Sequence, residues 1–462
     1  MKNKIYWIIL GIIIVIGVIV TVVLVNKNIT VEEFITPIEE EIEVKLEMGI
    51  GYSVEKNEKE AVQEAYTKMV EQLKGEEPVF AILTSTVGYN QDEILAEVNQ
   101  LLPNTKIYGS TSLMGIMTNS GFHIGEKVEE GNVLSLMGFS SEEMIFGVGA
   151  CNLDEVVSSE EAGKVAIIKA IENAGKTIKD LPKVVLMSSS PFGIGEEMVI
   201  KGIESVLGKD ILIVGGGATA GYSDLVSGGE ALFANNKVYS RGIVVAPIYT
   251  DLKVGHAFLS GFNQTGQKGI VTKFRRDDEG LNIVEIDNKP AAIVYNNWLD
   301  GFFDKYLGTS EMILAEAVNH TFGKKMIETD GFSNWQMIVP FHFNPDNSIT
   351  VGAVAEEGTE LYLLESNPEL FIQRAALAVK LAQSRGGITE KEIAGAVLDQ
   401  CGGTLLGIGD PEGWDEMVSK IVLAVGNNPF LGVSNLGPYG HFVGIGNKYG
   451  EVTASILIFS KD

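Results

Sequence analysis

Cysteine and histidine are scarce in this chain. Its 462 residues include only Cys151 and Cys401, together with five histidines. The cysteines form no Cys-x-x-Cys motif, and no two histidines stand in the His-Glu-x-x-His spacing of zinc proteases. We therefore expect no metal or other cofactor. One disulfide and two buried free thiols are both compatible with this pattern.

Positive charge is also in short supply. Lys and Arg number 35 against 61 Asp and Glu, so the formal net charge is −26. A surface of this sign repels the phosphates of nucleic acids, and we exclude nucleic-acid binding as the main activity. The chain has 45% apolar and 21% charged residues, which is typical of globular proteins, and its length allows two or three domains.

The N-terminal region contains one long stretch without charge, Ile5–Val25. At the rise of an α-helix it spans about 30 Å, the thickness of a bilayer core. Lys2 and Lys4 precede it and an acidic segment follows, which places the N-terminus in the cytoplasm and the main domain outside the cell membrane. A cleaved signal peptide is the alternative, but its apolar region would be shorter and would end in small residues. We predict a signal anchor over residues 1–27 and an acidic linker over residues 28–45.

The remaining sequence contains an internal repeat. Residues 79–115 and 183–221 match element for element, each predicting a strand, a helix and a second strand, with a hairpin to follow. A looser third copy begins with a predicted strand at Ser348–Val354. We predict an α+β fold of internally duplicated βαβαβ-plus-hairpin units, in which helices cover mixed sheets. The predicted domains are residues 46–260, with copies at about 46–150 and 145–258, and residues 261–462.

The strand at Ile211–Val214 ends in three glycines, Gly215, Gly216 and Gly217. With Ala220 they satisfy the G-x-G-x-x-A fingerprint of dinucleotide-binding proteins. That fingerprint requires a helix to begin at the turn, whereas a hairpin follows here. We therefore reject NAD and FAD binding.

Hydroxyl groups and glycines occur at equivalent strand ends of the first two copies. Ligands commonly bind at the carboxyl ends of strands, and hydroxyls with free backbone N–H groups suit a carboxylate or another polar solute. The alternative is that these residues only cap the following helices, as Ser190 would cap the helix from Glu196. The candidate ligand contacts are Ser110, Thr111, Ser112, Ser188, Ser189, Gly216, Gly217 and Thr219. Arg241 is a candidate counter-charge for a carboxylate, or a surface residue of a hairpin.

Several segments resemble the FIST family with its N-terminal and C-terminal domains in tandem. They are IYGSTSLMGI (107–116), IVGGGATAGYSD (213–224), FANNKVYSRGIVVA (233–246), AGAVLDQCGG (394–403) and FLGVSNLGPYG (430–440). The resemblance covers about Met48–Ser460. Ser110 stands where the family commonly has Cys, and Asn288 replaces a usual Gly. The resemblance implies a sensory role with a small ligand, for which amino acids are suggested, and it implies no catalytic residues.

These observations predict a membrane-anchored, extracytoplasmic binding protein for an amino acid or organic acid, which signals through a partner protein. We expect that it is not an enzyme. One alternative is a hydrolase-like enzyme with Cys401 or a strand-end serine as nucleophile, although no histidine base lies nearby in the sequence. The other alternative is a surface interaction protein without a ligand.

Overall fold

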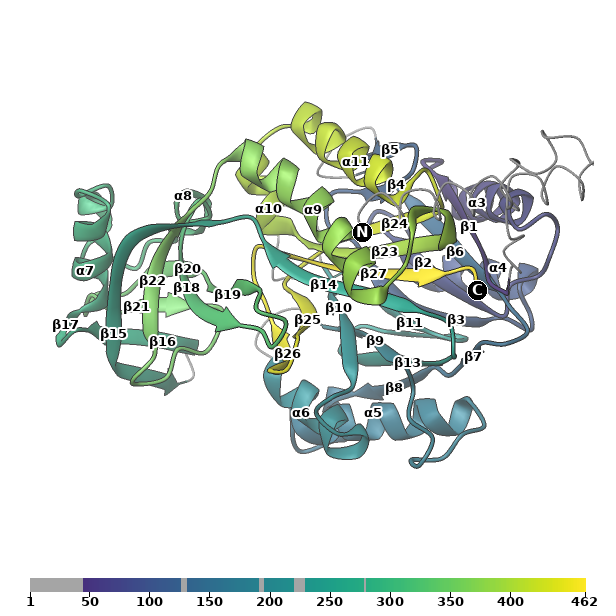
Figure 1. Cartoon of the computed structure of the whole chain (residues 1–462), viewed down its shortest axis with the longest axis horizontal. Helices are drawn as coiled ribbons and strands as arrows, with labels where there is room; N and C mark the ends of the chain where they lie inside the picture. Colours follow the sequence, from purple (N-terminus) through teal and green to yellow (C-terminus); the bar gives the residue numbers. More distant parts are fainter. Residues whose placement is uncertain (1–44, 126–130, 191–194, 220–228, 278–279) are drawn as a thin grey trace, which may run out of the picture. The chain divides into compact units, whose positions relative to one another are not determined.

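The structure is a computed structural model that describes residues 45–125, 131–190, 195–219, 229–277 and 280–462 (Figure 1). The predicted membrane span and nearly all of the acidic linker lie outside these residues. Within these ranges, no helix has the length and apolar character needed to cross a bilayer.

The first of three similar sheets combines the strands of the first repeat with one later hairpin. Its order is β1 (Glu47–Ser53), β6 (Leu134–Ser140), β2 (Phe80–Ser85), β3 (Lys106–Thr111), β11 (Leu232–Ala234) and β12 (Lys237–Tyr239). The helices of this repeat are α3 (Glu58–Gln72) and α4 (Gln91–Leu101). Asn57 and Asn90 cap these helices with their side chains.

The second and third sheets have the same plan. The second contains β7 (Ile145–Phe146), β8 (Gly149–Asn152), β13 (Gly242–Tyr249), β9 (Val184–Ser189), β10 (Leu212–Gly217), β25 (Pro438–Phe442) and β26 (Gly446–Tyr449). The third contains β14 (Val254–Ser260), β27 (Thr453–Ser460), β23 (Ile393–Cys401), β24 (Phe430–Asn435), β4 (Ile116–Thr118) and β5 (Gly121–His123). In Figure 1, α5 (Ser159–Asn173) packs on α6 (Glu196–Leu207), and α9 (Pro368–Gly386) packs on α11 (Pro411–Val425). A short helix, α10 (Gly402–Ile408), precedes α11 in the chain.

Each repeat donates its hairpin to the sheet of another repeat. The hairpin β4–β5 follows β3 in the chain but pairs with β24 of the third sheet. In the same way, β11–β12 follows β10 but pairs with β3, and β25–β26 follows β24 but pairs with β10. The three sheets are therefore joined in a closed cycle of hairpin exchange.

A fourth sheet is inserted in the third repeat. Its order is β19 (Ser333–Ile338), β18 (His320–Ile327), β22 (Glu360–Glu365), β15 (Asn263–Asp277), β16 (Gly280–Ile286), β21 (Ile349–Val351) and β20 (Pro340–Phe343), with β17 (Lys289–Pro290) paired to β16. Two short helices, α7 (Ala291–Trp298) and α8 (Leu314–Ala317), accompany it. The strand predicted at Ser348–Val354 forms as β21 but belongs to this insertion. The first strand of the third repeat is β14, nearly a hundred positions earlier in the sequence.

Successive side chains of the parallel strands point to opposite faces of each sheet, so the sheets have an inner and an outer core. In β2, Ala81 and Leu83 pack beneath α3 and α4, whereas Phe80 and Ile82 face a second cluster. That second cluster also contains inward side chains of the other two repeats, such as Leu186 of β9 and Val397 of β23. The three sheets thus share one inner core, and the predicted α+β class with helix-covered mixed sheets is confirmed.

Gly215 provides a test of the close contact between parallel strands. Its φ is +145°, and a Cβ atom there would lie 1.9 Å from the carbonyl oxygen of Met187. We expect Gly215→Ala to lower the free energy of unfolding by about 3 kcal/mol or more. The added methyl group would overlap the Met187 carbonyl, so the backbone of one of the two strands would have to move within a packed core. Urea unfolding followed by circular dichroism measures the loss. The control is Gly208→Ala, which meets open space but has a φ of +88°, so its backbone strain alone should cost about 1–3 kcal/mol, less than strain and steric overlap together at Gly215. Equal losses in the two variants would contradict the close-contact explanation.

Candidate functional site

The strand ends of the three repeats can be aligned through their sheet registers. In each repeat a glycine of the second parallel strand lies opposite the last apolar residue of the first. The pairs are Gly109 and Leu83, Gly215 and Met187, and Gly432 and Leu398. One position further on, Thr84, Ser188 and Asp399 are therefore equivalent. Each follows an inward-facing side chain by two positions, so each points to the inner face.

The first and second repeats meet through hydroxyl groups at this face. The Tyr108 Oη and Ser188 Oγ atoms are 2.8 Å apart. Ser188 Oγ also lies 3.4 Å from Ser110 Oγ and donates to it. All three side chains are buried. The sequence prediction that Ser110 and Ser188 belong to one location agrees with these contacts, whereas the contribution of Tyr108 was not anticipated.

The third repeat adds an acid and an amide. Asn435 Nδ2 donates to Asp399 Oδ1 over 2.8 Å. A Cβ atom on Gly216 would lie only 1.9 Å from Asn435 Nδ2, so the glycine of the second repeat allows this amide to approach. Backbone hydrogen bonds of Gly217 with Leu436 and Gly437 fix the same junction. We call Tyr108, Ser110, Ser188, Gly216, Asp399 and Asn435 the strand-end site.

Burial determines the protonation of this site. It raises the pKa of Asp399 from 3.8 to about 7, against the lowering effect of the hydrogen bond from Asn435. Burial, followed by the charge of Asp399, raises the pKa of Tyr108 well above its usual value. Asp399 can therefore gain or lose a proton near neutral pH, while Tyr108 stays protonated. Such a carboxyl group can donate a hydrogen bond, accept one, or transfer a proton.

The other predicted contacts hold the repeats together. Thr111 Oγ1 donates to the Thr219 carbonyl over 2.8 Å, and Ser112 Oγ accepts from the Ser434 amide over 2.9 Å. Ser189 Oγ lies 2.6 Å from Tyr439 Oη, which the sequence did not indicate. These hydroxyls already have protein partners.

Two further sequence-based assignments lie away from the strand-end site. Arg241 is exposed and forms an ion pair with Asp154 at 3.1 Å. Ser190 Oγ accepts from the Gly242 amide, and the N-cap of α6 is Gly195, which has no side chain to cap the helix. The helix-capping alternative is therefore not realised at Ser190.

Several buried polar atoms at the strand ends have no hydrogen-bond partner among the described residues. They are Thr219 Oγ1, Gln400 Oε1, Ser434 Oγ and Asn435 Oδ1. An unpaired buried polar group costs about 1–3 kcal/mol. Of these atoms, Asn435 Oδ1 lies in the strand-end site, so a polar solute bound there could supply the missing hydrogen bond.

The two cysteines are both buried and free, so they form no disulfide with each other. Burial raises the pKa of the Cys401 thiol, although backbone N–H groups of Gly403, Val452 and Gly437 partly oppose this. A thiol of this kind is a poor nucleophile at neutral pH. Over the described ranges, no group of three or more His, Cys, Asp or Glu residues could hold a metal ion.

One feature of the sequence could have identified Asp399, which the sequence prediction missed. Asp399 follows Leu398 as Ser188 follows Met187, but the third repeat is too divergent to align by eye. Asn435 is the last residue of β24 and Tyr439 belongs to β25, and only the hairpin exchange brings Tyr439 to the second sheet.

The pKa of Asp399 gives a pH-dependent prediction. The folded protein holds this proton between about pH 4 and 7, where the unfolded chain has lost it, so the free energy of unfolding falls as the pH rises through this interval. We expect Asp399→Asn to remove this part of the decline, in urea unfolding measured from pH 4 to 9. Glu451, whose pKa burial raises to about 8, contributes a similar slope to both proteins. Identical slopes in the wild type and the variant would contradict the assignment.

Comparisons with known proteins identify one domain and a distant set of structures. Residues 79–289 match the family model of the FIST N domain. No curated protein matches the chain. Among solved structures, a cyanuric acid hydrolase from A. caulinodans aligns with a TM-score of 0.35 and 8% identity over 89% of this chain and 99% of its own. A second cyanuric acid hydrolase structure aligns with a TM-score of 0.32 and 9% identity over 90% and 100%. Phosphoribosylformylglycinamidine synthase II from Thermotoga maritima has a TM-score of 0.21 and 10% identity over 90% and 72%.

The hydrolases overturn the expectation that the chain is not an enzyme, and we withdraw that expectation. Its premise was that no base lies near a nucleophile in the sequence, whereas folding places Asp399 within electrostatic reach of Tyr108, the hydrogen-bond partner of Ser188. A structural similarity at this TM-score gives no information about a substrate of this chain. The family match supports the N-terminal part of the resemblance seen in the sequence: residues 79–289 match the model of the FIST N domain, and FIST domains are a sensory domain family.

Proposed function

We propose that the protein is a membrane-anchored, extracytoplasmic sensor that binds a small polar solute, such as an amino acid or organic acid, at the strand-end site. The observation that carries this proposal is the buried Asn435 Oδ1, which has no hydrogen-bond partner among the described residues and belongs to the strand-end site beside Asp399. The match of residues 79–289 to a sensory domain supports it. A partner protein would carry the signal, and residues 261–462 would correspond to the C-terminal FIST domain.

The chemistry of the site favours a solute with both donors and acceptors. Ser110 and Ser188 offer hydroxyl groups, and Asn435 Oδ1 offers an unpaired acceptor. Asp399 can donate when neutral and can accept from an ammonium group when ionised, because its pKa is about 7. Ser110, Ser188, Gly216, Tyr108, Asp399 and Asn435 are the proposed contacts, and Thr111, Ser112, Ser189, Gly217 and Thr219 would support them.

A second candidate function is hydrolase-like catalysis at the same site. Its specific support is the 2.8 Å contact between Ser188 Oγ and Tyr108 Oη, together with a carboxyl group that titrates near neutrality. A positioned hydroxyl and a group with a pKa near the working pH are what nucleophilic and acid–base catalysis need. Ser188 would act as nucleophile in preference to Cys401, whose thiol pKa is raised by burial.

Ligand binding can be tested by thermal unfolding of the full chain with a panel of amino acids and organic acids. A bound solute at 100 times its Kd should stabilise the protein by about 2.7 kcal/mol. We expect Ser188→Ala to weaken the affinity for the solute at least tenfold, because it removes a hydroxyl that the site offers. The stabilisation at a given solute concentration should fall accordingly. Ser205→Ala removes an exposed hydroxyl of α6 that is not part of the strand-end site and should leave the affinity unchanged. Mass spectrometry of the solute after incubation separates the two candidate functions, since only an enzyme consumes it. A panel without any shift would refute the binding proposal.

The membrane anchor can be tested by fractionation of cells that express the full chain. We expect the protein in the membrane fraction and its main domain accessible to external protease, because Ile5–Val25 is long and apolar enough to span a bilayer. A variant that lacks residues 1–27 should be recovered in the soluble fraction. Recovery of the full chain in the soluble fraction, or protection from external protease, would contradict the proposal.

A further inference from the structure

A separate cleft lies between the second repeat and the inserted fourth sheet. Its volume is about 770 Å³, and its walls come from the first turns of α6, from β15 and β16, and from β20, β21 and the segment after β21. Tyr449 of β26 also lines it. Cavities that hold small organic molecules commonly measure about 300–1,000 Å³, so the cleft has the size of a ligand site.

Negative charge predominates on the walls of this cleft. Among the described residues, the lining acids are Glu196, Glu197, Asp277 and Glu356, and the lining bases are Lys201 and Arg276. A hydrogen bond to a carboxylate, such as the one that Glu197 accepts from Gln336 over 3.2 Å, leaves the charge of the carboxylate in place. With histidine counted as uncharged, four negative charges therefore face two positive charges.

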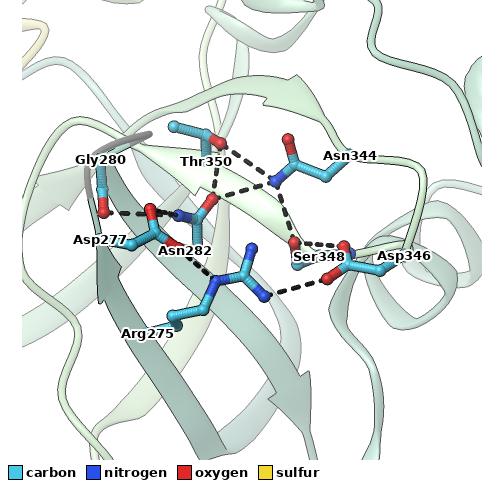
Figure 2. Close-up of polar contacts among 8 residues, drawn as sticks. All are labelled: Arg275, Asp277, Gly280, Asn282, Asn344, Asp346, Ser348 and Thr350. Carbon is cyan, nitrogen blue, oxygen red and sulfur yellow. Dashed lines mark hydrogen bonds and ion pairs between the residues drawn. The ribbon is translucent and has the colours of Figure 1, made fainter.

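The polar network of the β15–β16 wall does not reverse this balance (Figure 2). Arg275 bridges Asp277 and Asp346, and its Nη1 atom lies 3.0 Å from Asp346 Oδ2. One guanidinium is thus shared by two carboxylates, so the group of three keeps one negative charge. Asn282 Oδ1 accepts from Thr350 over 2.7 Å, which joins β16 to β21 in the same wall.

The N-terminus of α6 is the main positive contribution of the backbone to the cleft. A helix dipole places about half a positive charge at this end. Glu196 and Glu197 occupy the first turn of α6, and their two carboxylates outweigh half a charge. Both acids are half-buried, whereas Lys201 and Arg276 are exposed, where water and salt screen their charges. The balance favours a cationic ligand.

Two buried groups beside the cleft add to this preference. A Cβ atom on the lining Gly352 would lie 1.7 Å from Glu451 Oε1, so the buried Glu451 carboxyl lies directly behind the wall. Burial raises the pKa of Glu451 to about 8, against the Val339 N–H group, and the charge of Glu196 raises it further. Tyr449 is 3% exposed, and its Oη atom has no hydrogen-bond partner among the described residues. Burial and then the charges of Glu451 and Glu196 raise the pKa of Tyr449, so Tyr449 Oη is an unpaired acceptor in the field of two acids.

Apolar side chains from both walls favour a ligand with an apolar body. They are Met198, Phe274, Leu281, Phe341, Val351 and Tyr449. An apolar group placed between them would remove apolar surface of both walls from water. Phe274 and Phe341 are half-buried, and aromatic rings also attract cations to their faces.

We propose that this cleft binds an organic cation with an apolar body, such as an arylmethylammonium ion. The ammonium group would lie near Glu196 and Tyr449, and the apolar walls would enclose the ring. The cleft shares none of the six residues of the strand-end site, and its occupation does not depend on the function proposed for that site.

Two probes with the same apolar body test the proposal: naphthalen-2-ylmethylammonium and naphthalene-2-carboxylate. Isothermal titration of the full chain should show binding of the ammonium compound, with at least tenfold weaker binding of the carboxylate. The double variant Glu196→Gln/Glu356→Gln should weaken ammonium binding at least tenfold. The matched control Glu142→Gln/Glu412→Gln also removes one loop acid and one acid of a first helical turn, both exposed and outside the cleft, and should change the affinity less than twofold.

A second double variant should change the affinity in the opposite direction. Lys201→Gln/Arg276→Gln removes the two competing cations and should strengthen ammonium binding at least threefold, a gain that damage to the fold would not produce. Circular dichroism confirms that each variant is folded.

Five outcomes would overturn the proposal. They are the absence of ammonium binding, equal binding of the two probes, equal losses in the two acid variants, the absence of a gain in the variant without the two cations, and a loss of ammonium binding in Asp399→Asn. The last result would show that the probe occupies the strand-end site instead, because Asp399 is the acid of that site and lies outside the cleft.

Discussion

The backbone hydrogen bonds between each sheet and a hairpin from another repeat are the constraint on which the structure depends. Strand β10 cannot complete its ladder without β25, β3 requires β11, and β24 requires β4. An unpaired strand edge exposes N–H and C=O groups that must find partners. The exchange satisfies these groups and brings three sets of strand ends to one place, so the strand-end site is a result of the sheet pairing.

The chemistry of that site follows from its position at the end of the inner core. Apolar side chains of three sheets exclude water there, so a carboxyl group at Asp399 holds its proton to about pH 7. The same exclusion of water makes every unpaired polar atom expensive, which favours a solute that supplies matching groups. A sensor and an enzyme both benefit from this arrangement, and the difference between them lies in whether the bound solute reacts.

Local features of the fold could be predicted from the sequence. Caps such as Asn90 and apolar strands such as Val184–Ser189 mark their elements directly. Ser110 and Ser188 were both predicted as polar residues at strand ends, and they lie in contact. Features that depend on distant pairing could not be predicted. The hairpin β25–β26 carries no mark that assigns it to the second sheet, and the insertion separates β14 from its repeat so widely that β21 was taken for its first strand. Asp399 and Asn435 were missed because the third repeat is too divergent to align with the other two.

The hairpin exchange also has a consequence for how the chain acquires its structure. The second sheet is complete only when Gly215 meets Tyr439, and the third requires Leu431 to meet Thr118. Contacts between such distant segments form slowly, because the entropy of closing long loops is lost before the contacts stabilise the fold. The edge of β3 can close once β11 has formed, whereas β10 keeps an open edge until β25 has been synthesised. An open strand edge of this kind is a template for pairing with another chain, so the partly synthesised protein is exposed to aggregation until β25 is available.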